Sequence, residues 1–448
     1  MGGVWRWSLR RFPGAAAAAL CLALNVAAAR AADAPTPAGE VPPGPAPRSH
    51  PGEATPAQAT PGVSLEQVLT LARQRAPEID AARARLLQAE GSRYAGAVLP
   101  DPGVAYGSGR GEARTGGASA SESTLELSQF FPSPWALRSR SRSGSASIEA
   151  ARQGVGAVVV EVVFEAKRLY YEAATAGARA TALSQAALDA ASLSRLVARR
   201  VEVGEAPESD HLRTDVEARR TGIEARSATS EAGSARRVLD RFLLGALGDD
   251  FTLSTVLGPE TLPPPPDDFL EVALARSPIY RALQSRVEAA RWELSAERSS
   301  RLPGIGVSMF RERELDREAT GAGLSLVIPL WNRNEGAVRI AHGGLLAAEA
   351  EAAGARRRIE MESERLIARD RTAREIAVAY QRDILPSAGA ALAIAAISVE
   401  HGEASLLSWL EARRSYLEIL RASYDAQLQA YLARAELDRL MGDSDASW

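Results

Sequence analysis

The sequence predicts a mainly helical protein with a small β part, built from two copies of one unit that contains a long antiparallel coiled-coil hairpin. Three observations support this fold class. The segment VEVGEA at residues 201–206 recurs as VEHGEA at 399–404, and LDRFLLG at 239–245 recurs as LDRLMG at 437–442. Apolar residues follow a sustained heptad pattern, and two pairs of alternating segments interrupt the helical pattern.

The first residues have the composition of a secretory signal peptide. Arginines precede the apolar run AAAAALCLALNVAAA, and small residues favour cleavage after about Ala31 or Ala34. The run is shorter than the ~20 residues that span a bilayer as a helix, so we assign residues 1–31 to a signal peptide. The only cysteine, Cys21, lies within this run, and Leu20 stands where lipoprotein attachment needs a small residue.

Proline-rich segments divide the rest of the chain. Nine prolines fall between residues 33 and 62, which excludes a helix or a sheet interior there. The segment LGPETLPPPPDD at 257–268 is a second break. The expected organisation is a disordered linker at 32–63, a first repeat at 64–245, an inter-repeat linker at 246–267, a second repeat at 268–442 and a tail at 443–448.

The helices of each repeat follow from capping and periodicity. Ser64 opens a capping box, S-L-E-Q, and begins a helix that we expect to continue to about Ala97. A later helix has a seam that steps by four and three residues, the spacing of a coiled coil. The seam comprises Val155, Val159, Val162, Ala166, Leu169, Ala173, Ala176, Ala180, Leu183, Ala187, Ala190, Ser194, Val197 and Val201. In the second repeat, the helix after the recurring segment has apolar residues at heptad spacing, namely Leu410, Leu417, Tyr424 and Tyr431.

Four short segments alternate between apolar and small or polar residues, which predicts strands. They are residues 103–108, 123–130, 305–310 and 323–328, with polar loops expected at 109–122 and 311–321. The apolar positions predicted to share one face are Val104, Tyr106, Leu125, Leu127, Ile305, Val307, Met309, Leu324, Leu326 and Ile328. Turns that lead from strand to long helix are expected at Pro132, Pro134, Pro329, Asn332 and Asn334.

The repeated segments VEVGEA and VEHGEA interrupt long helices, and Gly204 and Gly402 supply the backbone freedom at which such a helix ends. We therefore interpret the two segments as the tips of two antiparallel hairpins.

The predicted strands need more partners than one chain supplies. Four strands cannot close a barrel around a passage, and further copies of the same chain are a source of strands. One hypothesis is a closed multi-chain barrel with an outward apolar band in a bacterial outer membrane. The other is a soluble sheet that caps the coils.

Other functions have little support. The formal net charge of −3 gives no footprint for nucleic acid, and the four histidines, His50, His211, His342 and His401, lie scattered without HExxH, a phosphate loop or a nucleophile elbow. We expect no enzymatic activity, no cofactor and no metal site. Glu208 and Asp210, near the first tip, are a candidate acidic entrance for cations, against the simpler interpretation of solvated helix carboxylates.

From about residue 64 to 442 the chain resembles the TolC-type outer-membrane efflux family. The resemblance rests on the duplicated layout, the tips VEVGEAPESD and VEHGEASLLSWLEA, the closing LDRFLLG and LDRLMG, and IPLWNRNEGAVRIA after the fourth strand. The last segment is similar to the CzcC/CusC-like branch, which serves heavy-metal exporters, with Glu335 in place of the usual glutamine.

The resemblance implies a homotrimer in which four strands per chain form a shared 12-stranded transmembrane β-barrel and the helices form a periplasmic α-barrel. It implies a passive exit duct, driven by an inner-membrane RND-type pump and gripped at its hairpin tips by a periplasmic adaptor. The tip residues that carry over are Val203, Gly204, Glu205, Ala206, His401, Gly402, Glu403 and Ala404. The alternatives are a periplasmic coiled-coil adaptor or scaffold, and a duct for drugs or other organic substrates.

Overall fold

The computed structural model describes residues 62–112, 116, 119–248, 250–254, 258, 262–314, 317–328, 331, 333–401 and 403–442. The predicted signal peptide, most of the predicted linker 32–63, Pro329, Asn332, Gly402 and the tail 443–448 lie outside these residues.

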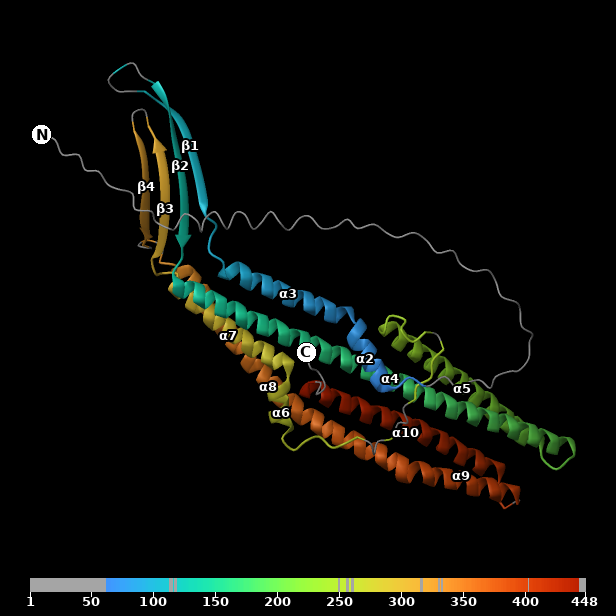
Figure 1. Cartoon of the computed structure of the whole chain (residues 1–448). Helices are drawn as coiled ribbons and strands as arrows, with labels where there is room; N and C mark the ends of the chain where they lie inside the picture. The colour runs from blue at the N-terminus through green and yellow to red at the C-terminus, as the bar shows by residue number, and fades with distance from the viewer. Residues whose placement is uncertain are drawn as a thin grey trace, which may run out of the picture. The chain divides into compact units, whose positions relative to one another are not determined.

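The two repeats follow the same order of two helices, two strands and a long helical hairpin, but the outgoing helix is continuous in the first repeat and divided by a π-helical turn in the second (Figure 1). The first consists of α2 (Leu65–Arg75), α3 (Pro77–Ala97), β1 (Gly103–Glu112), β2 (Ser119–Phe131), α4 (Pro134–Glu202) and α5 (Glu208–Phe242). The second consists of α6 (Phe269–Arg276), α7 (Pro278–Ser299), β3 (Gly304–Arg313), β4 (Glu318–Val327), α8 (Glu335–Ala379), the π-helical turn η2 (Tyr380–Ile384), α9 (Leu385–Glu400) and α10 (Leu406–Met441).

The prediction of one helix from residue 64 to 97 is wrong, because the chain forms two helices there. Ala76 has an extended backbone (φ −66°, ψ 117°) between α2 and α3. The ring of Pro77 disfavours a helical conformation for the residue before it. Ser277, before Pro278, breaks the second repeat in the same way (φ −54°, ψ 114°).

The predicted capping box at Ser64 is confirmed. The Ser64 N–H donates to Oε1 of Gln67 at 2.9 Å, and the Gln67 N–H donates to Oγ of Ser64 at 3.3 Å. Both donors would otherwise lack an intrahelical partner, so the box fixes where α2 begins.

The four strands form one antiparallel sheet in the order β1-β2-β3-β4. The strand prediction is right in number and place, but the strands are longer than predicted, and the expected loops 109–122 and 311–321 are largely strand. Arg110 pairs with Ser121, and Arg311 with Thr320, because polar residues join the backbone ladder as readily as apolar ones when both faces of this part are polar. The pair β2–β3 joins the two repeats into a single sheet.

The predicted heptad seam is confirmed as the packed side of α4. Most of its residues are buried and none is exposed. The helix is longer than the seam, and its 69 residues extend over ~100 Å at about 1.5 Å per residue. In α10, Leu410, Leu417 and Tyr431 are buried as the heptad spacing predicts.

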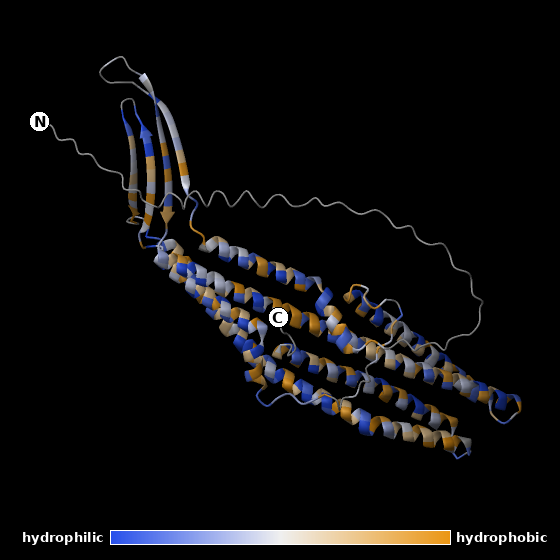
Figure 2. Cartoon of the chain, in the orientation of Figure 1, coloured by the Kyte–Doolittle hydropathy of each residue, from blue (hydrophilic) through white to orange (hydrophobic). Residues whose placement is uncertain are grey.

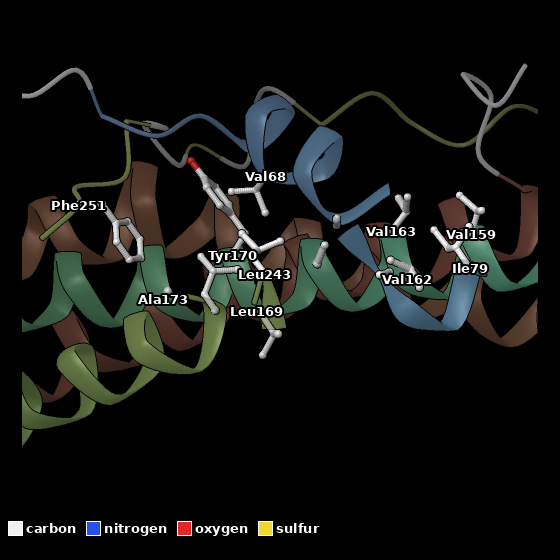
Figure 3. Packing of buried hydrophobic residues seen from close by; sticks show 14 residues of the cluster. Val68, Ile79, Val159, Val162, Val163, Leu169, Tyr170, Ala173, Leu243 and Phe251 are labelled. Atoms are coloured by element: carbon white, nitrogen blue, oxygen red, sulfur yellow. The ribbon is translucent and has the colours of Figure 1, made fainter. Parts of the chain in front are cut away.

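The largest apolar cluster lies where α2, α4 and the end of α5 meet (Figure 3). Tyr170 of α4 is fully buried there, and its hydroxyl donates to the carbonyl oxygen of Val63 at 3.3 Å. Phe251, from the segment expected to be an inter-repeat linker, packs into the same cluster. The start of this segment is therefore part of the first repeat's core.

Charged residues of α4 predict a pH dependence of stability. The Arg168 guanidinium donates to Glu165 and holds the pKa of that carboxyl below its ordinary value, against the raising effect of burial. A carboxyl with a lowered pKa stabilises the fold at neutral pH, and this stabilisation is lost as the pH falls through the lowered pKa. Arg168→Gln should therefore lower the melting temperature more at pH 7 than at pH 3. Thermal melts followed by circular dichroism test this, and Arg371→Gln, at a fully solvated pair, should have no effect at either pH.

Candidate functional site

The sheet has one apolar face, as the alternation predicts. Residues directly opposite each other in an antiparallel ladder lie on the same face, and the register pairs Val104 with Leu127 and Leu127 with Met309. All ten predicted positions fall on this face except Ile328, which lies one residue beyond β4. In the single chain these ten side chains are 41% to 80% exposed, so the face needs a cover that one chain does not supply.

Near the loops that join the strands of each pair, the apolar residues of this face give way to charged residues. Nε of Arg311 donates to a carboxylate oxygen of Glu318 at 2.7 Å, and Arg313 lies 3.5 Å from the same oxygen. Figure 2 shows the hydrophobic residues of the strands concentrated toward the helices and hydrophilic residues toward the loops. The face is therefore an apolar band with a polar rim.

The opposite face of the sheet carries mostly small residues, and its charged side chains are acidic. The Phe130 ring lies over Gly304 and the Phe310 ring over Gly321, so closely that a Cβ on either glycine would come within 2.4–2.5 Å of the ring. Among the described residues of this face, the charged side chains are Glu122, Glu126 and Glu312, and none is basic. The face therefore offers a negative, largely small-residue surface.

The strand-to-helix turns hold the sheet to the helices. Pro132 and Pro134 enclose Ser133, which is buried, and Pro134 is the first residue of α4. Asn334 adopts the left-handed conformation (φ 55°) that asparagine tolerates best after glycine. Its amide donates to the carboxylate of Glu297 at 2.6 Å, which ties the start of α8 to the end of α7.

The first predicted tip closes with a Schellman motif. Gly204 has φ +77°, its N–H donates to the carbonyl of Val201 at 3.0 Å, and the Glu205 N–H donates to the carbonyl of Arg200 at 2.8 Å. Only glycine adopts this conformation without strain, which explains its position in VEVGEA.

The second tip repeats the outer hydrogen bond of this motif. The Glu403 N–H donates to the carbonyl of Ser398 at 2.9 Å, at the same spacing of five residues. Ser405 then caps α10 by accepting from the N–H of Ser408 at 3.2 Å. The two tips thus share this outer hydrogen bond.

A groove of ≈ 590 Å³ lies between the two tips. Four of the predicted residues line it, namely Glu205, Ala206, Asp210 and Ala404. Val203, Glu208, His401 and Glu403 are not among its lining residues. Apolar side chains that we did not predict also line it, from α4 and α10: Leu196, Leu407 and Trp409.

The charged residues near the tips have ordinary structural partners. Asp210 lies 4.0 Å from Arg213, and Glu208 and Asp210 both stand in the first turn of α5, where the helix dipole favours carboxylates. Nδ1 of His401 lies 2.9 Å from the carbonyl oxygen of Ile397. Within the part of the chain that the structure describes, no group of three or more His, Cys, Asp or Glu side chains is placed to hold a metal ion.

Ion pairs that we did not predict connect α10 of the second repeat to the first repeat. Arg414 donates to Glu217 of α5 at 3.1 Å, and Arg421 donates to Glu224 one heptad further on. The neighbouring Arg413 is only 4% exposed, donates to the carbonyl of Ala186 in α4, and burial lowers the pKa of its guanidinium. The two glutamates and the two paired arginines share a seven-residue spacing, which marks them in the sequence as residues of one helix face but does not identify their partners.

One helical stretch stands out by its composition. By length and composition alone, the stretch Glu335–Val399 contains a window apolar enough to cross a membrane, and none of that window is buried in the single chain. In α9, Ile394 and Ile397 are exposed to solvent. The helix therefore resembles the sheet in needing a cover that the single chain lacks.

Residues 269–443 match the family described as "Outer membrane efflux protein". The chain is 26% identical over 399 residues to the cobalt-zinc-cadmium resistance protein CzcC of Cupriavidus metallidurans, and the alignment covers 86% of this chain and 92% of CzcC.

Two solved structures have the same fold. The structure of CusC superposes with a TM-score of 0.73 at 17% identity, covering 88% of this chain and 99% of CusC. The open state of the outer membrane channel MtrE of Neisseria gonorrhoeae superposes with a TM-score of 0.70 at 18% identity, covering 84% of this chain and 88% of MtrE. The match extends over both repeats, whereas the family match is confined to the second.

Proposed function

We propose that the chain is the exit duct of a tripartite efflux pump, conducting divalent metal cations passively from the periplasm to the outside, because residues 269–443 match the outer membrane efflux family and most of the chain is similar to CzcC. The observation that carries the proposal is the two-faced sheet. An apolar band on one face and small, acidic residues on the other suit a wall between lipid and water.

The duct requires more than one chain. Strands β1 and β4 are the edges of the sheet, and four strands are too few to close a barrel. We propose a homotrimer with a shared 12-stranded barrel, in which the predicted apolar positions face lipid. The exposed apolar surface of α9 would then be covered by the neighbouring copy in a helical wall.

The tips are proposed to bind a periplasmic adaptor, which links the duct to an inner-membrane RND-type pump. The α4 helix separates the first tip from the sheet by ~100 Å, so the tips project far from the membrane. The groove between them combines apolar side chains with Arg200 and Asp210, a mixture typical of binding surfaces for protein partners.

Divalent cations are proposed as cargo for two reasons. CzcC carries cobalt-zinc-cadmium resistance in its name, and the inward sheet face proposed here has carboxylates but no basic side chain among its described residues. The carboxylates attract cations without coordinating them tightly, which suits a passive conduit. The family is a transport family, so neither an enzyme nor a periplasmic adaptor is proposed.

Loss of the chain should abolish metal export. A host strain that lacks the gene should become sensitive to cobalt, zinc and cadmium salts and accumulate the ions, and the wild-type gene should restore tolerance. Leu407→Asp in the tip groove should fail to restore it, because charging an interface anchor weakens adaptor binding roughly 30-fold or more.

Leu87→Asp is the matched control, since Leu87 is an exposed leucine of α3 and does not line the groove. A strain whose metal tolerance is unchanged but which loses resistance to organic compounds would contradict the metal cargo. Normal export by Leu407→Asp would contradict the tip as the adaptor site.

A further inference from the structure

Each strand-to-helix turn carries a tryptophan exposed to solvent. Trp135 is the second residue of α4 and is 64% exposed, and Trp331, which follows β4, is 94% exposed. Both lie at the end of the sheet where the apolar band begins. The two exposed indole rings lie at corresponding turns of the two repeats. Each would be stabilised by an environment that accepts an apolar ring with one polar N–H.

Arginines accompany both tryptophans. Arg138 and Arg142 lie in the first turns of α4, and Arg333 and Arg339 flank the start of α8. All four are exposed, and none forms an ion pair with a carboxylate of the described residues, although the Arg142 guanidinium lies 4.4 Å from the centre of the Trp292 ring. Trp135, Arg138 and Arg142 lie three and four residues apart and so share one face of α4. We define the junction set as Trp135, Arg138, Arg142, Trp331, Arg333 and Arg339.

Contacts through α7 bring the two parts of the junction set to one region. The hydroxyls of Ser139 and Ser295 lie 3.1 Å apart, which joins the start of α4 to α7. Asn334, at the start of α8, donates to Glu297 near the end of α7. The set is therefore continuous with the helix-side border of the apolar band.

We propose that the junction set binds anionic phospholipid headgroups of the leaflet nearest the helices; this rests on the proposed outer-membrane duct. Tryptophan rings favour the depth between acyl chains and headgroups, and guanidinium groups bind phosphate in a bidentate way. Exposed arginines without a carboxylate partner, beside an apolar band, fit this ligand by charge, and the tryptophans fix the depth of the barrel in the membrane.

The test uses the purified full chain reconstituted in bilayers of phosphatidylcholine mixed with phosphatidylglycerol. The phosphatidylglycerol that stays with the protein after mild detergent extraction is measured by lipid mass spectrometry. Replacing the four junction arginines by glutamine should reduce its enrichment at least about tenfold, since each arginine near an anionic surface contributes roughly fivefold. The control replaces four exposed arginines on helix surfaces away from the sheet and should retain the enrichment: Arg226, Arg237, Arg357 and Arg358.

A second measurement concerns depth. The fluorescence lost in Trp331→Phe reports on Trp331, and it should be quenched more by lipids brominated near the headgroup than by lipids brominated near the chain end. If the glutamine variant does not assemble, replacement of the same four arginines by lysine should keep the assembly and part of the enrichment, because lysine keeps the charge but not the bidentate geometry.

The outcomes separate this inference from the proposed duct. A protein that inserts and assembles, but shows equal phosphatidylglycerol enrichment in the junction and control variants, overturns the headgroup site and leaves the duct intact. Quenching of Trp331 only by deep lipids does the same. A protein that enters neither neutral nor anionic bilayers overturns both.

Discussion

Leu324→Arg is expected to abolish assembly in the outer membrane. Leu324 lies on the apolar face of β4, opposite Val307, and is the most exposed of the ten predicted lipid-facing positions. An arginine facing lipid near the bilayer midplane destabilises a barrel by about 2–4 kcal/mol, and a trimer would carry three such arginines. Membrane fractionation should show the variant lost from the outer membrane, and electrophoresis without boiling should show no trimer.

Ser325→Arg is the matched control for this experiment. Ser325 is the next residue of the same strand and points to the opposite face, where its hydroxyl lies close over Gly306. The same charge at the neighbouring position should leave assembly intact if that face lines a water-filled passage. Equal loss in both variants would mean that neither face meets lipid, and the soluble capping sheet would become the better explanation.

Arg414→Ala is expected to loosen the second hairpin from the first. Its partner Glu217 is only 6% exposed on the side chain, so the substitution leaves a buried carboxylate without its cation. The folding free energy should fall by about 2 kcal/mol, less than the ~3–5 kcal/mol for breaking a fully buried pair, because Arg414 is half-exposed. Thermal melts and faster hydrogen exchange of the α10 amides would measure the change.

Two further variants test whether the buried charge is the cause. Replacing both Arg414 and Glu217 by methionine should recover most of the lost stability, because the buried carboxylate is then removed together with its cation. Arg219→Ala, which breaks a solvated pair with Asp215 on the same α5 helix, should leave the melt unchanged. If the double variant is as unstable as Arg414→Ala, packing by the arginine stem rather than charge holds the hairpins together.

The parts of the fold set by local rules could be predicted from the sequence. The Ser64 cap, the heptad seam of α4 and the alternation in β1 to β4 depend on neighbours within a few residues. The break at Ala76 was equally local, since Pro77 is its cause, and the sequence signal was present but not used. The predicted strands were too short, because polar pairs such as Arg110 and Ser121 show no alternation of apolar and polar residues.

The candidate site was predictable in part. Gly204 identified its tip because a glycine after a long helix has few other uses. The groove between the tips depends on Leu196 and Trp409, which come from different repeats and meet only after folding. The pairing of Arg414 with Glu217 is likewise a long-range contact, so its heptad spacing alone could not reveal the partner. Lipid, adaptor and neighbouring copies stay predictions, since they lie outside one chain.

The β2–β3 pair, which joins the two repeats, determines the order in which the strand pairs of the sheet can form. Its register pairs Ser123 with Arg313 and Phe131 with Ile305. This ladder therefore cannot begin to form until both strands have been synthesised and exported. The hairpins β1–β2 and β3–β4 close over short connections and can form first, whereas the central ladder must close a loop that contains α4 to α7. The β2–β3 ladder is therefore the last part of each sheet to form. Until it forms, each hairpin presents an extra unpaired strand edge in the periplasm.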